Sequence, residues 1–292
     1  MRRNKNTAFD YANCIVLLIV AVLCVYPFYY IFITSISDGV RLQNEVISTV
    51  PLTPNLEAYK HIFTNPKLDI TLGMRNSILY TVSGTVVAVC TTFMTAYVLS
   101  RRRFAGKYVI LGIYTFTWVF NAGTIPAYIF MNSLHLINNP LVMIIPGAIN
   151  VQFLVITKSF IDSLPYDLEE AALIDGANQF TIMTKIYLPV CKPIIATITV
   201  FYAVFMWNQY LAPKIYLQDP SMHTIQLVLQ RLVINQGGAN TSFSTFVQNG
   251  ILLNPQNLKA AAVFIAMVPI LLVYPFVQKY FQKGIMLGSV KG

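Results

Sequence analysis

The feature that most constrains the fold is a set of apolar blocks that run without a charged side chain. A helix of about 20 residues crosses the roughly 30 Å hydrocarbon core of a bilayer, and blocks of this kind are long enough to do so. Hydrophobic residues make up 56% of the 292 residues, charged residues only 11%, and the mean hydropathy is +0.61. This balance excludes a soluble domain of this size, so lipid must be the solvent for much of the chain.

Each apolar block is expected to cross the membrane as an α-helix, because lipid offers no hydrogen-bond partners to backbone N–H and C=O groups. The six blocks are Ala12–Ile36, Ser77–Leu99, Tyr108–Met131, Pro140–Thr157, Pro193–Pro213 and Ala260–Val277. The fourth block is the weakest, since it contains Asn150 and Gln152. The sequence therefore predicts an all-α integral membrane protein, with six transmembrane helices in a single transmembrane domain over residues 1–292.

A cleavable signal peptide is the alternative interpretation of the first block. Arg2, Arg3 and Lys5 precede it, and Ser35-Ile36-Ser37 has the small-x-small pattern of a cleavage site. The apolar region of a signal peptide usually has about 7–15 residues, however, and this block is longer. We therefore expect the segment to remain as the first span.

The distribution of Lys and Arg predicts the orientation, because these residues are enriched in cytoplasmic loops. With six spans, the amino tail, the loop after the second span and the carboxyl tail lie on one side. Their basic residues are Arg2, Arg3, Lys5, Arg101, Arg102, Arg103, Lys107, Lys279, Lys283 and Lys291. The short loop Asn132–Asn139 on the other side has neither Lys nor Arg. Both termini are therefore expected in the cytoplasm, together with the loop of residues 161–192.

Several functions are disfavoured by what the sequence lacks. The net charge of +9 is better explained by juxtamembrane residues than by nucleic-acid binding, because Arg101, Arg102 and Arg103 adjoin a span. The four cysteines have no metal-ligand or CxxC spacing, so neither a metal site nor a disulfide is indicated. A phosphate-binding GxxxxGK[ST] loop is missing, since Gly106-Lys107 is followed by Tyr108. We expect no catalytic site and no cofactor on this chain.

An ion-coupled carrier is the competing function from another class. Such a carrier needs ionisable residues at membrane depth, and the second, third, fourth and sixth blocks contain none. Two long outer segments, residues 37–76 and 214–259, would face whatever delivers a substrate. Passive connection is the alternative role for both.

The loop between Ile161 and Lys192 is predicted to form two short helices with a hinge. Pro165 suits a first helical turn, and Gly176 can adopt the left-handed conformation that ends a helix. A second helix is expected over residues 178–187, stopped by Pro189. The small Ala171 and Ala172 would let another element approach the backbone, although alanines and acidic caps could equally serve the helix alone.

This loop resembles the EAA loop of ATP-binding-cassette importer permeases. The resemblance rests on Glu170-Ala171-Ala172, then Gly176, then Ile186-Tyr187-Leu188-Pro189, in a cytoplasmic loop before the penultimate span. Other segments resemble the maltose-type carbohydrate branch of that family. They are Gly123–Tyr128, Leu134–Asn139, Ile145–Ala148, Trp207-Asn208-Gln209-Tyr210, where Gln209 and Tyr210 depart from the common Trp-Asn-Asp-Phe, and the tail Phe281–Gly292, which is like that of the second permease subunit.

The resemblance implies a type I importer permease fold in the bacterial inner membrane. It also implies a second permease subunit, two ATPase subunits that hold ATP and Mg²⁺, and an extracytoplasmic solute-binding protein. The implied substrates are sugars, namely oligosaccharides from polysaccharide breakdown, including acidic ones. A permease of the same superfamily for peptides, amino acids or phosphate is the alternative. The residues implied in ATPase coupling are Glu170, Ala171, Ala172, Asp175, Gly176, Ile186, Leu188 and Pro189.

Candidate substrate contacts come from the third and fifth expected spans. Aromatic faces together with amide and hydroxyl groups are common sugar-binding groups. The candidates are Trp118, Asn121, Tyr128, Tyr202, Trp207, Asn208 and Tyr210. Each could instead anchor the chain at the membrane interface or pack between helices. Arg75 and Arg231 on the outer side could attract carboxylates or snorkel to the interface.

Overall fold

The computed structural model describes residues 8–38, 50, 53–234, 246–248, 251–253 and 255–288. The helices in chain order are α1 Ala8–Ile36, α3 Glu57–Thr64, α4 Ile70–Leu99, α5 Lys107–Val119, α6 Thr124–Ser133, α7 Val151–Asp162, α8 Asp167–Ile174, α9 Gln179–Thr181, α10 Leu188–Val190, α11 Lys192–Trp207, α12 Leu211–Tyr216, α13 Ile225–Ile234 and α14 Pro255–Gly288. Short 3₁₀ turns are η1 Pro66–Leu68, η2 Pro140–Met143 and η4 Pro220–Met222, and η3 Ile182–Tyr187 is a π-helix. The predicted helical class is confirmed.

The structure adds one short hairpin to that class. Strand β1 Phe246–Gln248 pairs antiparallel with β2 Ile251–Leu253, so that Phe246 lies opposite Leu253. The hairpin falls in the second long outer segment. The chain divides into two compact units, Met1–Thr71 with Leu229–Pro269 and Leu72–Val228 with Ile270–Gly292.

Within the described residues, three helical segments are long and apolar enough to cross a bilayer: Phe9–Ile36, Ile70–Leu99 and Pro255–Pro275. A fourth candidate is the pair Gln179–Val190 and Lys192–Trp207, which is bent by 81°. The expected number of six spans therefore stays a prediction. α14 and α4 begin several residues before the apolar blocks that predicted them.

Three of the expected spans are not continuous helices, and one of them, the block from Pro193, divides into α11 and α12. The block from Tyr108 divides into α5 and α6, and Gly123 between them has a φ of +86° that few other residues adopt. The block from Pro140 divides into η2 and α7. The Asn150 side chain accepts hydrogen bonds from the backbone N–H groups of Gln152 and Phe153, so it starts α7 as a new helix. Hydropathy does not detect these breaks, because they depend on local hydrogen bonds.

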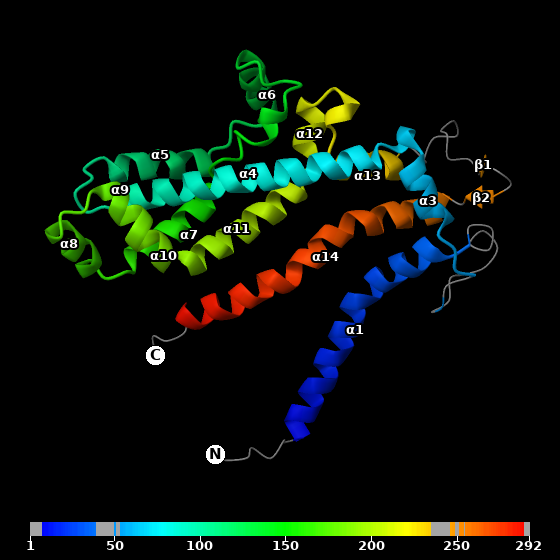
Figure 1. Cartoon of the computed structure of the whole chain (residues 1–292), viewed down its shortest axis with the longest axis horizontal. Coiled ribbons are helices and arrows are strands. Elements are labelled where there is room, and N and C mark those ends of the chain that lie inside the picture. Colours follow the sequence, from blue (N-terminus) through cyan, green and yellow to red (C-terminus); the bar gives the residue numbers. More distant parts are fainter. Residues whose placement is uncertain are drawn as a thin grey trace. The chain divides into compact units, whose positions relative to one another are not determined.

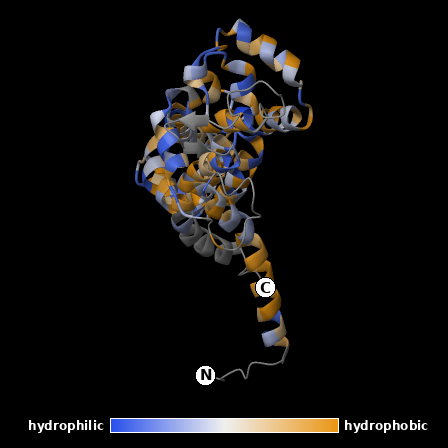
Figure 2. Cartoon of the chain, turned by 90° about the vertical axis from the view of Figure 1, so that its right-hand side faces the viewer, coloured by the Kyte–Doolittle hydropathy of each residue, from blue (hydrophilic) through white to orange (hydrophobic). Residues whose placement is uncertain are grey.

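The first unit is held together by the side chain of Asn257 on α14. Its amide nitrogen donates to the carbonyl oxygens of Thr34 at 2.9 Å, Ser35 at 3.2 Å and Ser37 at 2.7 Å, at the carboxyl end of α1. The Ser35 hydroxyl lies 2.6 Å from that of Tyr59 on α3. The apolar window of α1 has no residue buried in this chain, and the helix next to the amino end is largely hydrophobic (Figure 2). Such a surface suits contact with lipid or with a membrane-embedded partner.

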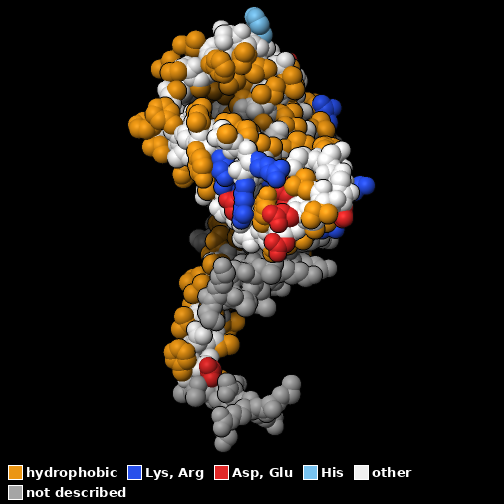
Figure 3. Space-filling model, turned by 90° about the vertical axis from the view of Figure 1, so that its left-hand side faces the viewer, with side chains coloured by type: hydrophobic (Ala, Val, Ile, Leu, Met, Phe, Trp, Pro, Cys, Tyr) orange, Lys and Arg blue, Asp and Glu red, His pale blue; other side chains and the backbone are white. Residues whose placement is uncertain are grey.

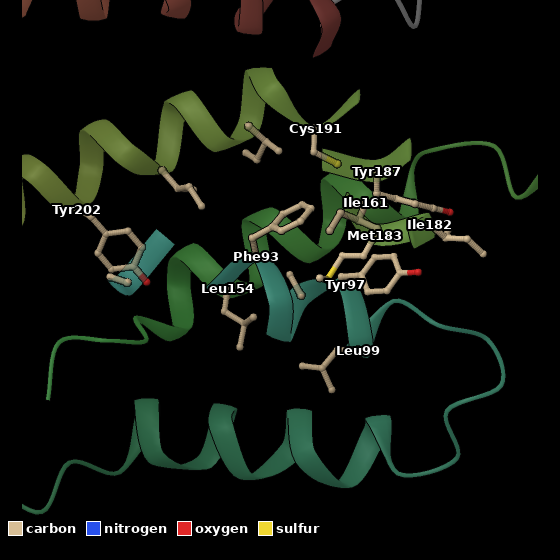
Figure 4. Close-up of a cluster of buried hydrophobic side chains, with 14 of the residues drawn as sticks. Phe93, Tyr97, Leu99, Leu154, Ile161, Ile182, Met183, Tyr187, Cys191 and Tyr202 are labelled. Atoms are coloured by element: carbon tan, nitrogen blue, oxygen red, sulfur yellow. The ribbon is translucent and has the colours of Figure 1, made fainter. Parts of the chain in front are cut away.

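In the second unit, α4, α5, α7 and α11 run side by side, with α8 at one end (Figure 1). Small residues on α4, including the fully buried Ala88 and Ala96, permit close helix packing. A buried cluster joins α4, α7, η3 and α11 (Figure 4). It includes Phe93, Tyr97, Leu99, Leu154, Ile161, Ile182, Met183, Tyr187, Cys191 and Tyr202. This core packs the loop of residues 161–192 against α4, α7 and α11.

Candidate functional site

The first helix of the loop, α8, ends in the manner that its glycine predicts. Gly176 has a φ of +78°, the N–H of Ala177 donates to the Ala172 carbonyl at 2.9 Å, and the N–H of Gly176 donates to the Leu173 carbonyl at 3.1 Å. This pair of bonds is the Schellman arrangement, which satisfies carbonyl groups left open at a helix end. A Cβ built on Gly176 would meet no atom within 4 Å. The glycine is therefore required by its backbone conformation, and the surface around it is open.

The outer face of α8 and its hinge is apolar and exposed. Ile174 at the end of α8 is 86% exposed, and Phe180 on α9, after the hinge, is 68% exposed. Leu168 and Ala171 on α8 also have accessible side chains. Glu170 is also exposed and, among the described residues, forms no ion pair. Apolar side chains of this size rarely remain uncovered on a polar loop, so this face is a candidate docking surface.

The neighbouring carboxylate, Glu169, has the opposite environment. Its side chain is only 7% exposed, and Oε2 accepts a hydrogen bond from Arg101 Nη1 at 2.6 Å. The Arg101 guanidinium lies 4.2 Å from the Tyr97 ring centroid and 4.4 Å from that of Tyr187, and its Nε donates to the Tyr97 carbonyl. We call Arg101, Glu169, Tyr97 and Tyr187 the arginine clamp. It ties the end of α4 to α8 and to η3.

The Arg101 guanidinium of the clamp stays protonated. Burial alone would lower the pKa of the Arg101 guanidinium, but its interactions with Tyr187 and Glu169 outweigh burial and raise the pKa above the usual value. Removing one partner of a buried ion pair leaves the other charge uncompensated and costs about 3–5 kcal/mol. The sequence alone does not indicate this clamp, because it marks Arg101 only as a juxtamembrane charge and gives no sign that Glu169 lies beside it. Two adjacent glutamates in one helical turn are the available signal, since they cannot both face the same side.

The second helical arm differs from its prediction at its end. It begins where Asn178 accepts a hydrogen bond from the N–H of Thr181 at 2.8 Å, and it continues through the π-helix to Val190. Pro189 was expected to stop the helix, which is wrong: the bend comes at Cys191. Pro189 lies in the first turn of α10, where a missing N–H does not break a bond that the helix needs.

The arm contributes both to the core and to the surface. Ile182, Met183 and Tyr187 are buried, and Tyr97 Oη donates to Gln179 Oε1 at 2.9 Å. Among the other predicted coupling residues, Ala172 is buried, Ile186 is half-buried, and Asp175, Leu188 and Pro189 are exposed. The predicted residues therefore lie in one region, where some are buried in the core and others are exposed on the surface.

The predicted substrate contacts differ in their surroundings. Trp118 is 58% exposed on α5, and Asn121 Oδ1 accepts from the Gly123 N–H at 2.8 Å. The Tyr128 ring stacks on Tyr216, with centroids 6.2 Å apart. Their assignment to a substrate path stays a prediction.

The candidates on and beside α11 are closer together but differ in burial. Tyr202 is fully buried, and its hydroxyl accepts from the Asn150 N–H at 2.9 Å and lies 2.6 Å from Thr92 Oγ1. Trp207 is 6% exposed, and its Nε1 has no hydrogen-bond partner in the part of the chain that the structure describes. Asn208 and Tyr210 are exposed. A buried N–H without a partner is rare, so Trp207 is the most informative of these residues.

Comparison with known proteins places these features in a family. The family model described as binding-protein-dependent transport system inner membrane component matches residues 88–287, which include the whole loop. The polygalacturonan/rhamnogalacturonan transport system permease protein YtcP of Bacillus subtilis (strain 168) is 38% identical over 288 residues, covering 99% of this chain and 100% of that protein. The galactooligosaccharides transport system permease protein GanQ of the same organism is 28% identical, covering 100% and 98%.

A solved structure is similar over nearly the whole chain. It belongs to a crystal structure of a bacterial ABC transporter involved in the import of the acidic polysaccharide alginate. The TM-score is 0.87 at 31% sequence identity, covering 96% of this chain and 99% of that chain. The expected permease fold and the resemblance to carbohydrate importers are both confirmed. The chain belongs to the family of inner membrane components of binding-protein-dependent transport systems, as a multi-pass permease subunit of the sugar-transport type.

Proposed function

We propose that this permease subunit serves an ATP-driven importer of oligosaccharides released from polysaccharides, and that acidic oligosaccharides are among its substrates. The observation that carries the first part is the exposed apolar face of α8 and its hinge, held on the transmembrane helices by the arginine clamp. The second part is supported by two of the similar proteins, whose named substrates, polygalacturonan and alginate, are rich in carboxylates.

The exposed face fits a groove on an ATPase subunit. Ile174 and Phe180 supply apolar contact area, and Ala171 has no side chain beyond Cβ to hold a partner away. Glu170 at the edge of this face would pair with a basic residue of the ATPase. Gly176, Ala172 and Asp175 shape the hinge, and Ile186, Leu188 and Pro189 continue the arm behind it. In this proposal the ATP and Mg²⁺ are held by two ATPase subunits, and this chain binds neither.

Force applied to the loop has a direct route into the membrane helices. The clamp joins α8 and η3 to the end of α4, and the bent arm runs through Cys191 into α11. A push on the loop would therefore move α4 and α11 together as a rigid body, which is one form of alternating access. A second permease subunit would complete the path between the two chains.

The path is proposed to include Trp207, Asn208 and Tyr210, at the end of α11 that lies away from the cytoplasmic loop. The unpartnered Trp207 Nε1 can donate to a sugar hydroxyl, and the exposed Asn208 and Tyr210 offer an amide and an aromatic face. Trp118, Asn121 and Tyr128 would add contacts from the third span, and Tyr202 would position α11 from within the core. An extracytoplasmic solute-binding protein would deliver the sugar.

The test is co-purification with the ATPase, followed by ATPase measurements with and without sugar-loaded binding protein in the assembled transporter. We expect stimulation by the loaded binding protein, and loss of both ATPase binding and stimulation in Phe180→Asp. Phe63→Asp is the matched control, because Phe63 is also exposed, at 62%, and belongs to α3 and not to the loop. Equal ATPase binding by both variants would contradict the proposed docking face.

Substrate class is tested separately by uptake of labelled oligogalacturonate and neutral galactooligosaccharide in proteoliposomes. We expect the acidic sugar to be preferred. Neutral sugar is the alternative, favoured by the likeness to the galactooligosaccharides permease, and preferred uptake of it would overturn the acidic assignment alone. Uptake that continues without ATP but collapses with an ionophore would indicate an ion-coupled carrier and would overturn the importer itself.

A further inference from the structure

A partly enclosed basic cavity of about 290 Å³ lies at the cytoplasmic end of the second unit, beside the arginine clamp. Five parts of the chain line it: the residues that follow α4, the start of α5, the end of α7 with the following loop, α8 and η3. Its charged lining residues are Arg101, Arg102, Lys107, Lys158, Asp162 and Glu169. The volume is many times the roughly 30 Å³ of one liquid water, which is ample for a phosphate ester.

The charges of this cavity are unbalanced. Both acidic residues are already paired, Glu169 with Arg101 and Asp162 with Lys158. The remaining cations, Arg102 and Lys107, contact only the rings of Tyr166 and Tyr108, and no carboxylate pairs with either one among the described residues. Figure 3 shows Lys and Arg side chains gathered together on this end of the molecule, beside the acidic residues.

The amino end of α5 adds to the positive potential. The helix has 13 residues, begins at Lys107, and has no side-chain cap from Gly106. The N–H of Lys107 donates to the Phe104 carbonyl, and the next N–H groups of the first turn can donate to an anion. Lys107 and Tyr108 in this first turn both line the cavity. Because the cavity and its two uncompensated cations adjoin this helix end, its positive potential is higher than that of an isolated helix terminus.

The surroundings favour a lipid as the source of the anion. Beyond its first turn α5 exposes Val109, Ile113 and Phe116, each 60% exposed or more, as expected for a helix that faces hydrocarbon. An apolar groove of about 330 Å³ runs along the same two helices, α4 and α5. Its lining is Met94, Thr95, Val98, Leu99, Phe104, Ile110 and Tyr114. Tyr108, 75% exposed, lies where aromatic residues mark the membrane interface.

We propose that this cavity binds the phosphate of an anionic phospholipid headgroup from the cytoplasmic leaflet, with Arg102 and Lys107 as its main ligands and the apolar groove beside it for an acyl chain. Basic pockets between transmembrane helices on the cytoplasmic side have this use in membrane proteins generally. A lipid held there would brace the α4–α5 loop against the clamp, next to the docking face. The proposal depends on membrane location and not on the identity of the transported sugar.

The test is phosphatidylglycerol binding to the full-length chain, purified with its partner subunits and followed by native mass spectrometry. Each basic residue near an anionic membrane surface contributes on the order of fivefold to affinity, so Arg102→Gln with Lys107→Gln should weaken binding roughly 25-fold. The matched control is Arg103→Gln with Lys214→Gln, because both residues are exposed and outside the cavity. This control should bind phosphatidylglycerol like the unmodified chain, and phosphatidylcholine should bind weakly to all three.

Two further arms distinguish other occupants. Inorganic phosphate or glycerophosphoglycerol that displaces the lipid at equal concentration would show a site for soluble phosphate, and would overturn the lipid assignment. If the double variant keeps its phosphatidylglycerol but loses the ATPase subunit, the occupant is an acidic side chain of the partner and the proposal is wrong. Thermal unfolding of each variant confirms that it is folded.

Discussion

In each of the two units one polar side chain holds the end of a helix, but one of these side chains is neutral and the other is charged. In the first unit the neutral Asn257, 1% exposed, donates to three carbonyl groups at the end of α1. In the second unit the charged Arg101 bonds Glu169 and lies between the rings of Tyr97 and Tyr187. The charged tie adjoins the exposed apolar face of α8, whereas the neutral tie lies at the end of the exposed apolar helix α1.

The difference follows from what each group needs when it is buried. An amide can satisfy its donors with carbonyl oxygens alone, so it ties a helix end without any second side chain. A guanidinium needs a counter-charge, so its position depends on where the carboxylate is. The neutral tie therefore fixes geometry, whereas the charged tie links the loop to α4 so strongly that a displacement of one should move the other.

Breaking the charged tie should have the largest effect. Arg101→Ala leaves Glu169 buried without a partner, and we expect the free energy of unfolding to fall by about 3–5 kcal/mol. Denaturant unfolding of the purified protein in detergent measures this, with Arg103→Ala as the control from the same loop. Arg101→Met combined with Glu169→Leu should recover much of the loss, because it removes both charges. A loss below about 1 kcal/mol for Arg101→Ala would contradict the clamp.

Breaking the neutral tie should cost less. Asn257→Leu removes the donor to three buried carbonyl groups, and we expect a loss of about 1–3 kcal/mol in the free energy of unfolding. Asn132→Leu is the control, since Asn132 is exposed and its side chain makes no hydrogen bond that the structure shows. The same unfolding experiment applies, and a cost equal to that of Arg101→Ala would remove the contrast between the two ties.

The hinge beside the charged tie should respond to backbone strain. Gly176→Val forces a β-branched residue to a φ of +78°, which costs about 1–2 kcal/mol. Gly112→Val is a matched control, because a Cβ at either glycine meets no atom within 4 Å but only Gly176 has a positive φ. We expect ATP hydrolysis to become uncoupled from sugar uptake in Gly176→Val alone. Normal coupling in that variant would show that the hinge conformation is not needed.

A third polar tie, made by the Tyr202 hydroxyl, should contribute less to stability than the ties of Arg101 and Asn257. Tyr202→Phe removes the hydroxyl that meets the Asn150 N–H and Thr92 Oγ1, and we expect a loss of about 0.5–1.5 kcal/mol. Tyr210→Phe, at an exposed tyrosine, should change stability little. Uptake measured at several sugar concentrations should give an unchanged KM for Tyr202→Phe. A raised KM with unchanged stability would instead assign Tyr202 to the substrate path.

Much of the site was predictable because the motif is local. The left-handed Gly176 and the start of α8 depend on residues within one or two helical turns, so their order in the chain suffices to predict them. Glu169 and Arg101 are 68 residues apart, and no pattern along the chain indicates that they meet. The end of the second arm was mispredicted at Pro189 because the π-helix before it changes which carbonyl each N–H reaches.

The sequence by itself determined that the chain is a membrane protein and that it is helical, and it singled out the loop that we propose as the ATPase contact. Those conclusions depend on hydrophobic block length and on short-range backbone rules, both of which are properties of consecutive residues. Only the tertiary structure decided that Glu169 faces inward while Glu170 faces outward, that Tyr202 is buried, and that the third, fourth and fifth blocks are broken. Burial and ion pairing depend on which helices lie next to each other, and that arrangement arises only when the whole unit packs.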